Sequence, residues 1–180
     1  MTLAKSFAAL QDAEFEEMLR LQRLYFREAS KCEEAKAFLP GCVMLAAALE
    51  AALIAMVHCF ADEVAGCKTA PHVNGAVKPV LKWRLVELLR VAKTLGWLPA
   101  GLRLEEAWQQ KRASIGDHAE VLRILRNLVH PAAYVAEHDG KRVISKHLAH
   151  AFQVLDIASK HLLARLNSSL RKHLGMAGCS

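Results

Sequence analysis

Residues 42–57 read CVMLAAALEAALIAMV, and this stretch decides the fold. Every side chain in it is apolar except that of Glu50, near the middle. Alanine and leucine lose little side-chain freedom in a helix, so the stretch favours helix over strand. It is rather short for a membrane span, and a carboxylate at its centre would be costly in lipid. We therefore expect a helix over about residues 41–65 that forms the buried centre of a soluble protein.

The sequence on both sides of this stretch predicts further helices. Before it, residues 12–38 carry apolar side chains at helical spacing with Glu and Arg between them. Pro40-Gly41 ends that pattern. After it, residues 80–95 repeat the helical pattern, which stops at Gly96.

The loop over residues 66–80 contains Asn74-Gly75, a pair that is common in tight hairpin turns. Hairpin strands usually show alternating apolar and polar residues on both sides of such a pair. No alternation of this kind flanks Asn74-Gly75, so we expect a loop without strands.

The second half of the chain predicts two more long helices. Residues 117–130 form a helical pattern that Asp117 can cap, and residues 145–174 form a longer one that Ser145 can cap. A helical turn or two is expected over residues 104–111. The sequence thus predicts an all-α fold, a bundle of about five helices.

At 180 residues, one domain is the default, and it is long enough to bury a substantial core. We expect an N-terminal accessory helix in residues 1–38, the bundle core in residues 39–174 and a tail in residues 175–180. Residues 1–20 lack a basic region followed by a continuous apolar stretch, so we expect no secretory signal and a cytoplasmic protein.

Charge and cysteine content narrow the function classes. The formal net charge is +6, which suits an anionic partner such as RNA, although no run of five basic residues occurs. The five cysteines are an odd number without CxxC spacing, which fits a reducing compartment and argues against a disulfide framework. His58, Cys59, Cys67 and His72 match no metal-ligand spacing, so we expect no metal and no other cofactor.

Residues 120–130, EVLRILRNLVH, contain the group of polar side chains that is most informative about function. On a helix, Arg123, Arg126, Asn127 and His130 fall within an arc of about 100°, opposite the apolar side chains. Guanidinium groups match phosphate oxygens, and an imidazole exchanges protons near neutral pH. This stripe is sufficient for metal-independent cleavage of RNA, with His130 moving the proton and an arginine stabilising the phosphorane. The same residues are also common on the solvated face of an ordinary amphipathic helix.

The segment LRNLVHP, preceded by a further arginine, resembles the motif helix of HEPN-domain proteins. The order of helices around it, over roughly residues 39–166, is similar to that of uncharacterised bacterial HEPN-like proteins. The resemblance implies a helical bundle that commonly forms a homodimer, with two motif helices building a composite ribonuclease site. It also implies a toxin or phage-defence component, with an antitoxin or a nucleotidyltransferase as a possible partner.

The chain departs from the family pattern in the spacing of its arginines. The family has an arginine, four to six residues and then histidine, with a polar residue directly after the arginine. Arg126 is followed by Asn127 but lies too close to His130, whereas Arg123 has the spacing but is followed by Ile124. Which arginine is catalytic, and whether the site is active, therefore stays open.

Glu50 provides a second clue, because a carboxylate in an apolar helix needs a cation or hydrogen-bond donors. We expect it to meet Arg123 or Arg126 and hold that guanidinium in place; an exposed helix edge is the equal alternative.

Three hypotheses follow from these features. The first is a homodimeric, metal-independent endoribonuclease that acts on RNA. The second is a catalytically inactive helical interaction module that binds RNA, a nucleotide or a partner protein. The third is a ligand-binding bundle whose pocket opens onto Glu50.

Overall fold

The computed structural model describes residues 10–98 and 143–173. Within these residues the chain forms five α-helices, one short 3-10 helix and one β-hairpin whose two strands are two residues long each. The predicted all-α bundle is confirmed. The expected helices over residues 104–111 and 117–130 lie outside the described residues.

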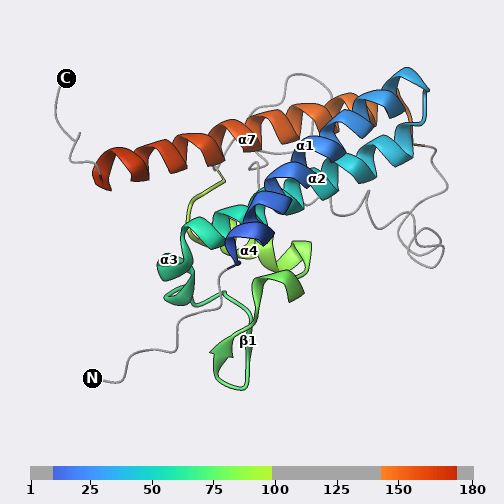
Figure 1. Ribbon diagram of the computed structural model, residues 1–180. Helices are drawn as coiled ribbons and strands as arrows, with labels where there is room; N and C mark the ends of the chain where they lie inside the picture. The colour runs from blue at the N-terminus through green and yellow to red at the C-terminus, as the bar shows by residue number, and fades with distance from the viewer. Residues whose placement is uncertain (1–9, 99–142, 174–180) are drawn as a thin grey trace, which may run out of the picture.

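Helix α2 (Phe38–Cys59) is the centre of the bundle, as its composition predicts. Helices α1 (Asp12–Glu34), α4 (Leu85–Thr94) and α7 (Ser145–His173) all pack on it. In Figure 1, α1 and α7 run along α2 in the upper part of the view, and α4 lies beneath it. Leu45, Leu49 and Leu53 of α2 are fully buried. Helix α2 is long and apolar enough to cross a membrane, but 67% of its most apolar 18-residue segment is buried inside the protein. That burial is typical of the core helix of a soluble protein.

The boundary between α1 and α2 differs from the predicted one. Helix α1 ends at Glu34, Lys36 adopts a left-handed φ of 57°, and α2 begins at Phe38. Pro40 therefore lies in the first turn of α2 and does not separate two helices. Proline is tolerated there because the first N–H groups of a helix have no partner within the helix.

The predicted helix over residues 41–65 is divided in two. Helix α2 ends at Cys59, and a separate short helix, α3, spans Ala61–Ala65. The break is at Phe60, whose φ of −119° lies outside the helical range. Phe60 is 7% exposed and packs against the ring of Trp97, so burial of this ring accompanies the break.

The prediction of a strandless loop around Asn74-Gly75 is wrong. Strands β1 (His72–Val73) and β2 (Ala76–Val77) pair in antiparallel register around these two residues. Asn74 has a φ of 52° and Gly75 a φ of 77°, the left-handed pair of a type I′ turn. Two-residue strands are too short to show alternation in sequence, so the turn pair was the only available signal.

The predicted helix over residues 80–95 begins later than expected. A 3-10 helix, η1 (Val80–Lys82), is followed by extended backbone at Trp83 and Arg84, and α4 begins only at Leu85. The predicted end is confirmed, because Gly96 follows α4 with a left-handed φ of 67°. Helix α7 begins at Ser145 itself, so Ser145 is not its cap. The N–H of Ile144 donates instead to Nδ1 of His147, 3.1 Å away.

Candidate functional site

Four of the five predicted site residues, Arg123, Arg126, Asn127 and His130, lie outside the described residues. Their predicted grouping on one helix face stays a prediction. So does the predicted contact between Glu50 and one of these arginines.

Glu50 lies on α2, the central helix, and is half-buried. The half-buried positions Val43, Ala47, Glu50 and Ile54 follow one another at intervals of four, three and four residues. This spacing places them on one edge of α2, while the residues between them are mostly buried. Glu50 takes part in at least one interaction with another group. Its position on the accessible edge is compatible with both predicted roles.

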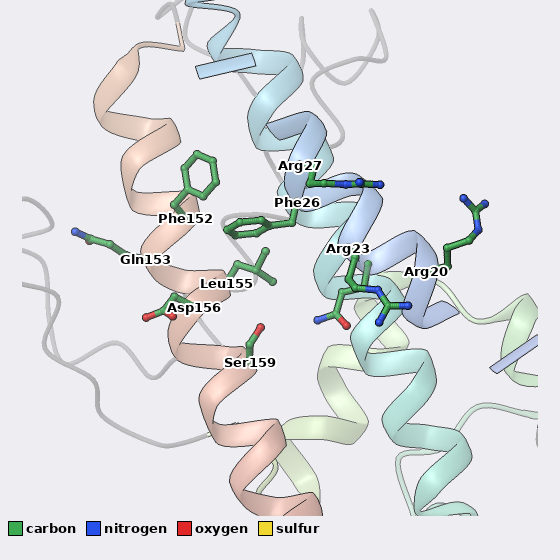
Figure 2. A pocket seen from close by; sticks show the side chains of 10 residues that line it. Arg20, Arg23, Phe26, Arg27, Phe152, Gln153, Leu155, Asp156 and Ser159 are labelled. Carbon is green, nitrogen blue, oxygen red and sulfur yellow. The ribbon is translucent and has the colours of Figure 1, made fainter. Parts of the chain in front are cut away.

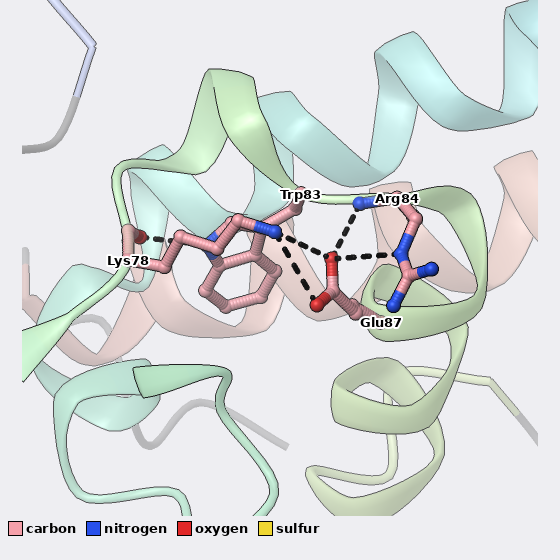
Figure 3. A network of polar contacts seen from close by, with 4 residues as sticks. All are labelled: Lys78, Trp83, Arg84 and Glu87. Atoms are coloured by element: carbon pink, nitrogen blue, oxygen red, sulfur yellow. Dashed lines mark hydrogen bonds and ion pairs between the residues drawn. The ribbon is translucent and has the colours of Figure 1, made fainter. Parts of the chain in front are cut away.

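A polar network joins the hairpin loop to α4 (Figure 3). The carboxylate of Glu87 accepts the backbone N–H of Arg84 at 2.6 Å and the ammonium of Lys78 at 3.2 Å. The indole N–H of Trp83 donates to the carbonyl oxygen of Lys78 at 2.7 Å. Burial raises the pKa of Glu87, but the Arg84 N–H and the Lys78 ammonium outweigh burial and leave this pKa lowered. Each of these polar groups has a hydrogen-bond partner within the network. The network therefore holds the start of α4 against the loop that contains Lys78.

A groove separates α1 from α7, and we call it the α1–α7 groove. Its larger part has a volume of about 810 Å³. The described residues that line this larger part all belong to α1 or α7. They are Arg20, Gln22, Arg23, Phe26, Arg27, Phe152, Gln153, Leu155, Asp156 and Ser159. Phe26 points from α1 toward α7, where its ring meets that of Phe152 edge to face at 5.6 Å (Figure 2). Phe26 is still 45% exposed.

The groove continues toward the start of α1 as a smaller apolar cavity of about 180 Å³. Gln22 and Ser159 line both parts, so the two parts are adjacent. The floor of the smaller part is formed by α2, and its walls carry Phe15 from α1 and Leu162, Leu163 and Leu166 from α7, among others. Leu163 is 58% exposed. The two parts together form a long, mainly apolar surface, with Gln22 and Ser159 where they meet.

The two walls of the groove differ in charge. On α1, Arg20 pairs with Glu17, whereas no described carboxylate pairs with Arg23 or Arg27. On α7, Asp156 pairs with Lys160 at 2.6 Å. Positive charge without a described counterion therefore lies on the α1 wall.

Two of the described cysteines, Cys42 and Cys59, have thiols of raised pKa. Burial raises the pKa of Cys42 to about 12, and it raises the pKa of Cys59 as well, so both thiols are poor nucleophiles at neutral pH. Cys67 contacts the hydroxyl of Thr69, and His72 contacts a backbone carbonyl. Among residues 10–98 and 143–173, no group of three His, Cys, Asp or Glu side chains is placed to hold a metal ion.

The groove was not predicted from sequence, although a signal for it exists. Arg20, Arg23 and Arg27 follow one another at intervals of three and four residues, and Phe26 lies beside them. Basic side chains on a charged helix are usually a solvated face, and nothing in the sequence of α1 shows that α7 lies across from it. Only the packing of both helices on α2 creates the groove.

Helical bundles serve many unrelated functions, so the all-α fold alone identifies neither a reaction nor a ligand. Three features remain on which a function can be argued: the motif segment over residues 120–130, Glu50 and the α1–α7 groove. No family model, curated protein or solved structure matches this chain.

Proposed function

We propose that this protein is a metal-independent endoribonuclease of the HEPN type. One observation carries the proposal: Arg123, Arg126, Asn127 and His130 share one face of an expected helix whose other face is apolar. The all-α bundle supports it as a suitable scaffold, and the net charge of +6 suits an RNA substrate.

The proposed reaction uses the 2′-hydroxyl of RNA as the nucleophile. His130 removes the proton of that hydroxyl or protonates the leaving 5′-oxygen, and an arginine neutralises the charge that develops on the phosphorane. Asn127 orients the imidazole or holds a ribose edge. None of these steps requires a metal ion.

Cleavage of RNA in the presence of EDTA tests the proposal. The wild type is compared with His130→Ala, with Arg123→Ala and Arg126→Ala singly and together, and with Arg90→Ala on α4 as a matched arginine control. We expect the wild type and the control to cut RNA, and His130→Ala to lose at least about a hundredfold in rate, the usual worth of a general acid–base. The single arginine variants identify which guanidinium acts. If the folded wild type cuts no RNA, or His130→Ala cuts as fast as wild type, the ribonuclease proposal is wrong.

The proposed active form is a homodimer, in which two motif helices contribute to one composite site. Sedimentation equilibrium over a range of concentrations tests this part separately. A monomer at concentrations where RNA is cleaved would contradict the composite site without contradicting cleavage.

The second candidate is a catalytically inactive interaction module in the cytoplasm, with a partner such as an antitoxin or a nucleotidyltransferase. The observation that favours it is the α1–α7 groove, because an exposed apolar surface of this length commonly marks a binding site. A wild-type protein that binds a partner but cuts no RNA would support this candidate.

A further inference from the structure

We infer that the α1–α7 groove binds an acidic amphipathic helix of a partner protein. This binding site lies between α1 and α7, above a floor of α2, and it does not depend on ribonuclease activity. The described residues leave apolar surface uncovered at Phe26, which is 45% exposed, and at Leu163, which is 58% exposed. Contiguous exposed apolar surface with a polar rim is characteristic of docking sites.

The dimensions of the groove fit a helix. Its lining residues run from Phe15 to Arg27 on α1 and from Phe152 to Leu166 on α7. At a rise of about 1.5 Å per residue, these segments are each roughly 20 Å long, which matches about 13 residues of a docked helix. A docked helix would insert apolar anchors three and four residues apart between the two walls, the usual mode of helix recognition in a groove.

The charges of the walls select an acidic helix. Figure 2 shows Phe26, Leu155 and Phe152 between the two helices, with the guanidiniums of Arg23 and Arg27 on the α1 side. Because no described carboxylate pairs with these two arginines, glutamates on one edge of the docked helix would meet uncompensated positive charge. The single carboxylate in the α7 wall, Asp156, is already paired with Lys160, so it does not oppose an acidic ligand strongly.

The same observations disfavour two other occupants. The C-terminal part of α7 in a second copy presents the exposed Leu170, but Arg171 and Lys172 beside it would face Arg23 and Arg27 with like charge. Single-stranded RNA prefers flat aromatic faces on which its bases stack. Phe26 and Phe152 meet at 81°, and the ring of Phe15, the third phenylalanine that lines the groove, is already stacked on His58, so these rings offer no pair of parallel faces between which a base could stack.

A displayed peptide library tests the inference directly. Each 18-residue member has leucine, isoleucine or phenylalanine at fixed positions along one helical face. The positions at the two edges of that face are randomised among glutamate, glutamine and lysine. Selection on the full-length protein is expected to enrich glutamate along one edge, with binders that compete for a single site.

Variants of the full chain locate that site. Phe26→Ala is expected to weaken the selected peptides by at least about tenfold, since buried aromatic anchors dominate such interfaces. Arg23→Glu/Arg27→Glu is expected to weaken acidic peptides about tenfold and to enrich lysine when the selection is repeated. The matched control Lys82→Glu/Arg90→Glu makes the same change in charge at exposed positions of η1 and α4 and is expected to leave binding unchanged.

Several outcomes would overturn the inference. They are a library without enriched sequences, enriched peptides that bind Phe26→Ala as tightly as wild type, or an equal preference for lysine on the wild type. A 12-nucleotide single-stranded RNA that binds the wild type and is lost with Phe26→Ala, while no peptide binds, would reassign the groove to nucleic acid. Self-association that is abolished by Phe26→Ala, again without peptide binding, would reassign it to a second copy. Loss or retention of RNA cleavage in His130→Ala bears on the proposed function alone.

Discussion

The two regions on either side of α2 use their polar groups in opposite ways. On the α4 side, the carboxylate of Glu87, the ammonium of Lys78 and the indole N–H of Trp83 are all bonded to one another or to backbone. Across the α1–α7 groove, the aromatic ring of Phe26 is half exposed and Arg23 has no described counterion. Buried polar groups that satisfy one another stabilise a fold, whereas uncompensated ones beside an apolar surface suit a ligand. The comparison thus separates a structural side of the bundle from the side on which we propose binding.

Truncation of one apolar side chain on each side should give the largest contrast. Leu88 of α4 is 1% exposed, so Leu88→Ala leaves a cavity and is expected to lower the free energy of unfolding by about 2–5 kcal/mol. Phe26→Ala removes a half-exposed ring and its edge-to-face contact, so a loss of about 1 kcal/mol is expected. Urea denaturation followed by circular dichroism measures both. Equal losses would show that the α1–α7 side is as much a part of the core as the α4 side.

Removal of the Glu87 charge should have the next largest effect. Glu87→Gln keeps the shape but loses the ion pair with Lys78, whose side chain is 21% exposed, and is expected to cost about 1–2 kcal/mol at neutral pH. Because the pKa of Glu87 is lowered from 4.5 in the folded protein, its charge stabilises the fold fully above that value. The stabilisation is lost as the pH falls through the lowered pKa. The stability difference between wild type and variant should therefore be constant from pH 7 to pH 5 and shrink below about pH 4, in unfolding experiments at several pH values. A difference that grows at low pH would contradict the lowered pKa.

Sequence could predict the central helix and the helices around it, but not the breaks between them or the groove that they form. Residues 42–57 are apolar on nearly all sides, with Glu50 as the exception, and only a helix packed from several directions buries such a surface, so α2 and the all-α fold follow. The stop at Gly96 follows from its freedom at positive φ. The break at Lys36 did not follow, because lysine is rarely left-handed and Pro40 was the more usual signal. The groove did not follow either, because it depends on Phe26 and Phe152, which are far apart in the chain. The motif residues Arg123 to His130 lie outside the described residues, so their arrangement on one helix face stays a prediction.

The hairpin on the α4 side allows a smaller test of local geometry. Gly75 has a φ of 77° and open space around it, so Gly75→Ala meets no neighbour but must adopt a left-handed backbone. We expect a loss of about 1 kcal/mol in the free energy of unfolding. Gly66 is the matched control, since its φ of −83° suits any residue and a Cβ there would lie 3.7 Å from its nearest neighbour. Gly66→Ala is therefore expected to be neutral. If both variants behave alike in thermal unfolding, the type I′ turn contributes nothing measurable to stability.

The smallest effect is expected from the ion pair at the rim of the groove. Asp156→Asn is the same chemical change as Glu87→Gln, because each replaces a carboxylate with an amide of the same shape. The side chains of Asp156 and Lys160 are 55% and 72% exposed, so water and salt screen their attraction. We expect a loss of about 0.5 kcal/mol or less, which disappears in 1 M NaCl. Binding of an acidic peptide should be unchanged or slightly tighter, since a negative charge has left the rim. A loss as large as that of Glu87→Gln would show that the α7 wall is held rigid by its own polar contacts, and the contrast between the two sides of α2 would then fail.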